Sequence, residues 1–556
     1  MAYRHFAYRA AEEVLRRFPE RSVYVVEAGV TPSGKIHLGN FNDVVIADAV
    51  LKALKDLGFE AIGYLVIDSK DPFRRPPEFA PEEFKRESGR YVGRPFEELP
   101  DPWGCHESYA VHFVEPVETS FEDYGVEIRV VWASKLHKDA RFVELLERVI
   151  DERENVRNIM NRVRERAGHK TLYPPGWIPF RPQCANCGRI DEVVKPLDVL
   201  GGHLIKYKCA ACGHEGIADV RKGEGKPPWR VDWPLRWVAL DVHFEPLGKD
   251  HMASGSGYDT GSALAREFFG REPPVPVFYD FVYWVERKNG EKVYSKFSKR
   301  RGVGLGVDEW LRYAPPEVLR FQILKRDVTD IQSEALSHWE FDMRFLPDYV
   351  EEFDRYEKVY FDIIEGEGRK SQLVIDTYRL TMAGKVPAKR PRRVSYKSLA
   401  LVALWMRDVE DGMEILRRQG KLRDLEDWEV RDVRRRLVMA RNWVEAVGAT
   451  SVLLPLEDAA SRLLSLPEPE RGIIMEFLSQ VASGLRAEEA QARIRELAER
   501  VGLKTRSERL RVYRGLYQAL LGESSGPPVR RLLANPGIRG YLSKLYKRIS
   551  EHSVAA

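Results

Sequence analysis

Residues 31–40, TPSGKIHLGN, place a tight turn and several polar groups between an expected strand and an expected helix. His37 and Asn40 stand at the head of that helix, where both side chains can donate hydrogen bonds to phosphoryl oxygens. Gly34 and Gly39 let the backbone approach a flat or charged ligand, and a helix N-terminus favours an anion. The stretch therefore predicts a phosphate site at the carboxyl end of a sheet strand. A helix cap with an incidental histidine is the alternative.

A second polar segment, residues 291–305 (EKVYSKFSKRRGVGL), is dominated by basic side chains. Lysines such as Lys296 and Lys299 on such a loop suit the negative charge that develops on a pyrophosphate leaving group. For this segment taken alone, a solvated run of surface charge is the alternative.

Four of the five cysteines form two Cys-x-x-Cys pairs in a loop-like region. Two such pairs supply the four thiolates of a tetrahedral structural zinc site. Gly188 and Gly213, one after each pair, permit the tight turns that the site needs. The expected ligands are Cys184, Cys187, Cys209 and Cys212. The gap between the pairs is slightly longer than in most zinc ribbons, and strands over EVVKPLDVL and HLIKYKC would fill it.

Disulfides are the alternative for these four cysteines, but the expected cytoplasmic location disfavours them. His203 or His214 could replace one ligand. Cys105 stands apart from the pairs, and we expect it to be a plain buried or half-buried thiol.

The composition is that of a soluble, multidomain chain. Its 556 residues can hold three or more domains or subdomains, each with its own core. No apolar run reaches the roughly 18 residues of a membrane helix, and the N-terminus reads as an amphipathic helix rather than a signal peptide. We therefore expect no membrane association and a cytoplasmic location. The net charge of +4 is only mildly basic, so nucleic-acid contact must be argued from local patches.

Alternating strand and helix patterns position the first polar stretch. SVYVVEAG and EAIGYLVIDS read as buried strands with a helix, FNDVVIADAVLKALKDLG, between them. That order predicts a right-handed βαβ unit and a parallel sheet. VEIRVVWAS, LRWVALDVHFEPLG and VPVFYDFVYWVE read as further strands, and residues 139–168 as one long helix. From about residue 316 the pattern is helical, so we expect an α/β half followed by an all-helical half.

Together the two polar segments resemble the paired signatures of class I aminoacyl-tRNA synthetases. HLGN (37–40) resembles the HIGH signature with Asn in fourth place, and KFSKR (296–300) resembles KMSKS with Phe for Met and Arg for the last Ser. The TPSG lead-in, WRVDWPLRW, FEPLGKDH, GSGYDTG, FLPDYVEEFDRYEKVYF and GCHESYAVHF make residues 1–410 similar to the class I lysyl-tRNA synthetases found mainly in archaea. Lys70 departs from the pattern, in a stretch expected to be more acidic.

The resemblance implies that the protein activates L-lysine with ATP and Mg²⁺ to give lysyl-adenylate and pyrophosphate. It then passes the lysyl group to the terminal ribose of tRNA(Lys), and activation can depend on bound tRNA. The expected catalytic residues are His37, Asn40, Lys296 and Lys299, with Lys299 favoured as the group on the β and γ phosphates. The expected ATP-binding residues are Pro32, Gly34, His37, Gly39, Asn40 and Lys299.

The same resemblance implies a lysine pocket at the strand ends. The expected lysine-binding residues are Glu27, Gly29, Thr31, Trp229, Asp232 and His251, and Asp250 and Asp259 are further candidates to face the pocket. A buried ammonium needs a carboxylate partner, and we favour Asp232 slightly over Glu27 for that role. Ion pairing with Arg230 or Arg236 is the alternative for Asp232.

The resemblance also implies a domain order. A Rossmann-type catalytic domain has its first half at 1–100, an insertion at 101–228 with the zinc knuckle at about 180–216, and its second half at 229–290. The KMSKS-type loop and stem-contact region spans 291–345, and an α-helical anticodon-binding domain spans 346–556. We expect a monomer with residues 385–397 as a candidate tRNA contact. Trp405, Trp428 and Trp443 fit a core better than base-stacking platforms.

Two other readings stay open. A glutamyl-type class I synthetase would share the fold, but the carboxylates at Glu27, Asp232 and Asp259 favour a cationic substrate. A zinc-containing RNA-binding factor on an inactive nucleotide fold would be expected to lose His37 and Lys299, and both are present.

Overall fold

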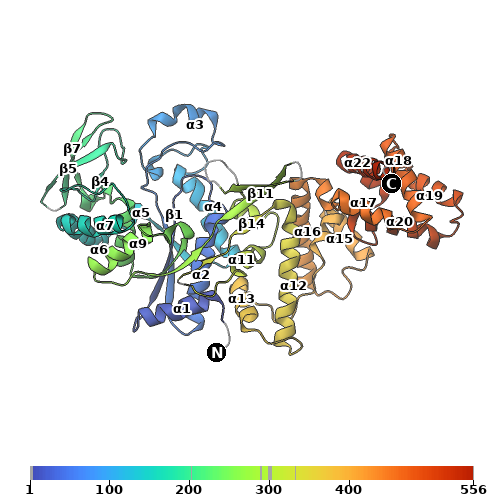
Figure 1. The fold of residues 1–556 in the computed structure, drawn as a ribbon, viewed down its shortest axis with the longest axis horizontal. Coiled ribbons are helices and arrows are strands. Elements are labelled where there is room, and N and C mark those ends of the chain that lie inside the picture. Colours follow the sequence, from blue (N-terminus) through green and yellow to red (C-terminus); the bar gives the residue numbers. More distant parts are fainter. Residues whose placement is uncertain (1–3, 202, 289–290, 298–303, 332, 555–556) are drawn as a thin grey trace. The chain divides into compact units, whose positions relative to one another are not determined.

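The first half of the chain is built on a six-stranded sheet in which every adjacent pair is parallel (Figure 1). The computed structural model describes residues 4–201, 203–288, 291–297, 304–331 and 333–554. The strands, in spatial order, are β13 (Ala335–Leu336), β10 (Val275–Tyr279), β9 (Val242–Gly248), β1 (Tyr24–Val30), β2 (Ala61–Ile67) and β3 (Ile128–Trp132). The predicted parallel sheet is confirmed.

The helices α1 (Phe6–Arg17), α2 (Leu38–Asp56) and α8 (Trp229–Ala239) contact strands of this sheet, while α9 (Gly257–Glu267) packs on α8 and α11 (Pro316–Leu324) packs on α2. The helix α2 contacts β1, β2 and β9, and its apolar residues are buried on nearly every face. A helix that is apolar all round belongs inside a domain, so α2 and the turn before it are held rigidly against the sheet.

Two sequence expectations are wrong in detail. The segment read as one strand, LRWVALDVHFEPLG, begins inside α8, and only β9 is extended. Three tryptophans four residues apart give α8 one aromatic face that packs on α9, and this tertiary packing overrides the strand-like composition. The long helix expected over 139–168 is two helices, α6 (Ala140–Asp151) and α7 (Arg153–Arg166), because Glu152 leaves helical geometry at φ −91° and ψ 25°.

Two insertions interrupt the sheet order. The first follows β2 and carries α3 (Glu82–Glu87) and α4 (Tyr109–Tyr124). The second follows β3 and carries α5 (Ala133–Leu136), α6, α7 and the strands β4 (Arg181–Pro182), β5 (Val194–Leu200), β6 (Leu204–Cys209), β7 (Glu215–Asp219) and β8 (Gly225–Lys226). The strands β5, β6 and β7 form an antiparallel sheet, which confirms the two strands expected between the cysteine pairs.

A small second sheet follows β10. It consists of β12 (Glu291–Lys296), β11 (Val282–Lys288) and β14 (Trp339–Phe341), in that order. The helices α10 (Val307–Trp310), α12 (Leu346–Ile364) and α13 (Gln372–Met382) lie in the same stretch of the sequence.

The chain divides into two compact units. One comprises residues 1–310, 316–342 and 356–388, and the other 311–315, 343–355 and 389–556. The second unit is helical, with α14 (Tyr396–Ala403), α15 (Val409–Arg418), α16 (Asp427–Val447), α17 (Leu456–Leu464), α18 (Glu470–Ala482), α19 (Ala490–Arg500), α20 (Arg506–Leu521), α21 (Val529–Ala534) and α22 (Pro536–Val554). The finer domain borders drawn from the sequence remain predictions. Within the described part of the chain, the search for a helix that could cross a membrane found none.

Candidate active site

The order of the strands fixes where a ligand can bind. From β1 the chain moves outward to β2 and β3, and it then returns to the other side of β1 as β9. In open α/β sheets, ligands bind where the strand order reverses, beyond the carboxyl ends of the strands. The reversal falls between β1 and β9, so the site lies between the turn at 31–37 and the loop at 249–256.

The two signature-like segments meet at this edge. The rings of His37 and Phe297 are 5.2 Å apart, and a Cβ on Gly39 would lie 3.1 Å from the His37 ring. The backbone N–H of Leu38 also donates to the carbonyl of Leu305 at 3.1 Å. The structure therefore joins HLGN to both flanks of the basic loop. Lys299 lies outside the described residues.

Asn40 and His37 form the first turn of α2. The His37 backbone N–H donates to Oδ1 of Asn40 at 3.4 Å, so the Asn40 carbonyl oxygen acts as a cap. His37 is buried and its side chain packs beside Gly39. In the preceding turn, Pro32 and Gly34 are buried. Lys296 ends β12 and is exposed, with Nζ 3.9 Å from the centroid of the Phe281 ring.

An aromatic wall stands on the β9 side of the site. Trp229 and Trp233 of α8 stack with ring centroids 4.8 Å apart, and His251 lies 5.6 Å from the first ring and 5.1 Å from the second. Glycine allows this packing, because a Cβ on Gly257 would lie 2.5 Å from Trp229. The structure thus brings the predicted residues Trp229 and His251 together.

Glu27 lies in β1, two residues before Gly29, and is fully buried. Neither of its carboxylate oxygens has a hydrogen-bond partner among the described residues, although Arg236 Nη1 lies 3.9 Å from Oε1. Burial raises the pKa of Glu27 well above its ordinary value, and the neighbouring Glu245 raises it further. A buried carboxyl group without hydrogen-bond partners among the described residues is suited to receiving a cation.

Thr31 connects to the same group of charges. Its hydroxyl donates to Asp68 Oδ2 at 3.4 Å, and Asp68 Oδ1 lies 3.1 Å from Arg236 Nη1. Asp68 directly follows β2. The ends of β1 and β2 therefore share one buried ionic cluster with α8.

Asp232 belongs to a different cluster. Its Oδ1 is hydrogen-bonded to His137 Nε2 at 2.8 Å, and Lys226 Nζ lies 3.7 Å from Oδ2. Lys226 also pairs with Asp71 at 2.6 Å. Burial alone would raise the pKa of Asp232, but these basic neighbours lower it below its ordinary value. The chain's own basic groups therefore hold this carboxylate.

Lys70, which departs from the family pattern, lies beside that cluster. It is buried and donates to the carbonyls of Gly223 and Gly225. Burial lowers its pKa to about 8. Lys70, Asp71 and Asp232 together attach the second insertion to the sheet.

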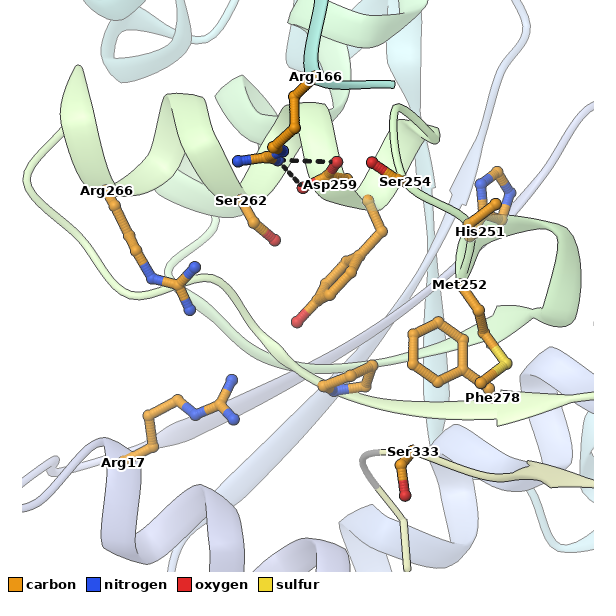
Figure 2. Close-up of a pocket in the computed structure, with 13 residues that line it drawn as sticks. Arg17, Arg166, His251, Met252, Ser254, Asp259, Ser262, Arg266, Phe278 and Ser333 are labelled. Carbon is orange, nitrogen blue, oxygen red and sulfur yellow. Dashed lines mark hydrogen bonds and ion pairs between the residues drawn. The ribbon is translucent and has the colours of Figure 1, made fainter. Parts of the chain in front are cut away.

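A cavity of about 610 Å³ opens beside the loop that follows β9 (Figure 2). His251, Met252 and Tyr258 line it, together with arginines that come from α1, α7 and α9. Figure 2 shows Arg166 paired with Asp259, at 2.7 Å. Asp259 also accepts from the backbone N–H of Gly255, so it stabilises the loop rather than standing open to a ligand.

The two cysteine pairs converge as expected for one metal ion. The four Sγ atoms lie within 4.8 Å of one another, with Cys184 to Cys212 at 3.6 Å and Cys187 to Cys209 at 3.7 Å. These separations are far longer than the roughly 2.05 Å of a disulfide and match the edges of a tetrahedron around zinc. Gly188 and Gly213 adopt φ of 73° and 77°, as the predicted turns require.

The expectation for Cys105 is wrong. Its side chain is exposed, and it belongs to a second group of possible metal ligands. These are Asp101, Cys105, His106 and His112. Its Sγ lies 3.0 Å from Nδ1 of His106 and 3.4 Å from Nδ1 of His112.

The other separations in this group are close to the edges of a tetrahedral zinc site but slightly shorter. The two Nδ1 atoms are 3.1 Å apart, and Asp101 lies 3.1 Å from His112. Around one zinc ion, N, O and S ligands are separated by about 3.3–3.8 Å. In the sequence, Cys-His followed six residues later by His was the available signal. It was hidden because the ligands are of three types and do not form paired cysteines.

This second group is connected to the site. The helix that carries His112 also carries Tyr109, whose hydroxyl donates to the Ser33 carbonyl at 3.1 Å. A metal at Asp101 and His112 would therefore stabilise α4 and, through it, the turn at 31–37.

A parallel sheet with HLGN at its strand reversal and both flanks of a basic segment in contact with it defines the catalytic fold of a class I aminoacyl-tRNA synthetase. The family model described as tRNA synthetases class I (K) matches residues 4–383, and the chain belongs to this family. The motif-based resemblance is thereby confirmed.

Curated relatives match over nearly the whole chain. The lysine–tRNA ligase of Methanocaldococcus jannaschii is 33% identical over 548 residues, covering 96% of this chain and 98% of the relative. The lysine–tRNA ligase of Pyrococcus horikoshii is 34% identical over 543 residues, covering 96% and 97%. A solved glutamate tRNA ligase from Elizabethkingia meningosepticum is 13% identical with a TM-score of 0.33, covering 95% of this chain and 99% of that one. That similarity is too low to argue from.

Proposed function

We propose that this chain is a lysine–tRNA ligase that activates L-lysine with ATP and Mg²⁺ and transfers it to the 3′ end of tRNA(Lys). The observation that carries the proposal is the contact between HLGN and the basic loop at the strand reversal, where His37 meets Phe297. The curated relatives named as lysine–tRNA ligases support the choice of amino acid.

Two displacements make up the reaction. In the first, a carboxylate oxygen of lysine attacks the α-phosphorus of ATP and pyrophosphate leaves. In the second, a hydroxyl of the terminal ribose attacks the carbonyl carbon and AMP leaves. Neither step needs a strong base, so the protein acts by positioning the reactants and stabilising charge.

The α2 N-terminus forms the ATP side of the site. We assign His37 and Asn40 to the phosphates, because they stand at a helix N-terminus, where the helix dipole favours negative charge. Pro32, Gly34 and Gly39 form the close backbone around the nucleotide. Lys296 and Lys299 supply positive charge to the leaving pyrophosphate.

The lysine side of the site is the group at β1 and α8. We assign Gly29 and Thr31 to the amino-acid backbone, and Trp229 with His251 to the methylenes. For the ammonium we now prefer Glu27 to Asp232, because His137 and Lys226 already hold Asp232. A glutamyl substrate would add a further carboxylate beside Glu27 and Asp68, which like-charge repulsion opposes.

The C-terminal end of the chain supports the tRNA assignment. Residues 501–556 contain eleven Lys or Arg and three Asp or Glu, within a chain of net charge +4. Lys544 and Lys547 of α22 are exposed. Clustered exposed cations favour the phosphate backbone of RNA.

Part of the positive charge in the basic stretch 385–397 is already paired with acidic side chains of the same unit. Arg392 pairs with Glu429 at 2.9 Å, and Arg393 with Asp432 at 2.5 Å. Trp443 is buried, and its indole donates to a backbone carbonyl. This burial favours a core residue over a base-stacking platform.

We further propose two structural zinc ions, one held by the four cysteines and one by Asp101, Cys105, His106 and His112. Zinc with four protein ligands contributes to folding rather than to chemistry. We also keep as proposals that the protein is a cytoplasmic monomer.

ATP–pyrophosphate exchange, measured with each amino acid in turn and with or without tRNA, tests the proposal. We expect exchange to depend on lysine. Exchange with glutamate instead would favour the glutamyl-type alternative, and no exchange with any amino acid, even with tRNA present, would favour the RNA-binding factor.

A further inference from the structure

A second buried acid accompanies Glu27 at the strand reversal. Glu245 lies in β9, next to β1 in the sheet. Val26 pairs with Phe244, so Glu27 and Glu245 stand one residue beyond a matched pair and face the same side. Glu245 is 5% exposed. It belongs to the FEPLGKDH segment that carries the family resemblance, but the sequence alone assigned it no role, because a lone acid in a strand is usually solvent-facing.

Two indoles hold Glu245 in place. Trp233 Nε1 donates to its carboxylate at 2.9 Å and 3.0 Å, and Trp237 Nε1 donates to Oε2. Trp233 is also the ring that stacks on Trp229 and contacts His251. The aromatic wall therefore leads directly to the carboxylate of Glu245.

The acids here outnumber the bases. Glu27, Glu245 and Asp68 share one buried arginine, Arg236, whose Nη1 lies 3.1 Å from Asp68 and 3.9 Å from Glu27. Asp43 on α2 adds negative charge at Glu245. Asp232 on α8 adds some at Glu27, although His137 and Lys226 pair with it.

Two buried carboxylates with so little compensation cannot both ionise at low cost. Burial raises the pKa of Glu245 to about 7, although its indole donors and Arg236 oppose that rise. Since the pKa of Glu27 is raised as well, burial favours retention of a proton on this pair in the free protein. The two groups titrate as a unit.

We propose that Glu27 and Glu245 together receive the substrate's ε-ammonium, and that the ammonium displaces the proton that the pair holds in the free protein. This inference rests on the proposed function. The exchange balances in charge, because one positive group enters and one proton leaves to solvent. Glu245 is then a specificity-determining residue, and Trp233 and Trp237 are its positioning residues.

The exchange makes lysine binding depend on pH in one direction. Below about pH 7 the pair holds its proton in the free protein, so binding must expel it and the lysine KM rises by up to about tenfold per pH unit. Above that range the pair is already ionised and the KM levels off. A side chain of similar length without an ammonium, such as norleucine, should bind better at low pH, because the singly protonated pair carries one negative charge rather than two.

Calorimetric titration of the full-length protein with lysine tests the inference. Measurements at pH 6 and pH 8, each in two buffers of different ionisation enthalpy, count the protons released. An ATP analogue that cannot be cleaved is present throughout. We expect about one proton per lysine at pH 6 and a clearly smaller number at pH 8. Equal, near-zero release at both pH values would overturn the proposal.

Variants separate this inference from the proposed function. Glu245→Gln keeps an oxygen for the indole donors. We expect it to raise the lysine KM about 10–200-fold, as for loss of a charge-assisted hydrogen bond. The ATP KM should stay unchanged, and fewer protons should be released on lysine binding. Glu267→Gln, at the exposed end of α9, is the control and should change neither. Lysine-dependent exchange with an unaltered lysine KM in Glu245→Gln would refute the role of Glu245 but leave the proposed function intact. Absence of lysine-dependent exchange in the wild type would refute both.

Discussion

Gly257→Ala tests whether the aromatic wall forms the lysine pocket. The new Cβ would lie 2.5 Å from Trp229 Cη2 and 2.9 Å from Trp233. Ordinary contact begins at 3.4 Å, so the Trp229 ring or the start of α9 must move by about 0.9 Å. Overpacking of this kind costs about 1–3 kcal/mol.

A displacement of about 1 Å in a substrate-positioning group can cost about 10²-fold. We therefore expect Gly257→Ala to raise the lysine KM by about 10–100-fold in ATP–pyrophosphate exchange, with the ATP KM changed by less than about threefold. Gly89→Ala is the matched control, because nothing lies within 4 Å of a Cβ there. A folded Gly257→Ala protein whose lysine KM stays within about threefold of wild type would refute the assignment of the wall.

Four further predictions concern other parts of the molecule. Lys299→Ala should lower the activation rate by about 10²–10³-fold with little change in either KM. Single-turnover kinetics measure this rate, and a rate like that of the wild type would assign the role to Lys296 instead. His112→Ala should reduce the metal content, measured by mass spectrometry, from two zinc ions per chain to one; unchanged content would rule out the second site. Asp232→Asn should cost about 3–5 kcal/mol of stability by breaking a buried ion pair. Because the pKa of Asp232 is lowered in the folded chain, that stability is present at neutral pH and lost on acidification. A thermal melt of the variant like that of the wild type would contradict this prediction. Lys544→Glu with Lys547→Glu should weaken tRNA binding and flatten its salt dependence, and an unchanged salt slope would place the RNA elsewhere.

The parallel sheet and the cysteine site were predictable because each has a local signal. Strand and helix periodicity fixes the βαβ order, and paired cysteines followed by glycine indicate a zinc knuckle whatever the tertiary context. HLGN and KFSKR indicated one site although about 250 residues separate them, because both motifs suit phosphate chemistry. The contact of His37 with Phe297 brings them together.

Other features depend on partners that are remote in the sequence. Asp232 looked suited to a substrate ammonium, but its partner His137 is 95 residues away, and no local pattern connects the two. The role of Glu245 depends on two indoles and on an acid in a neighbouring strand. The end of α8 resembles a strand in sequence because Trp237 and Val238 are typical of strands, whereas Gly257 and Gly261 across the interface make the helical packing possible.

The central claim is that this chain joins lysine, and no other amino acid, to tRNA. The most direct test incubates the purified protein with ATP, Mg²⁺, tRNA(Lys) and all twenty amino acids together, and identifies the aminoacyl group on the recovered tRNA by mass spectrometry. We expect lysyl-tRNA alone. Glutamyl-tRNA, or recovery of only uncharged tRNA from a protein that binds it, would refute lysine-specific charging.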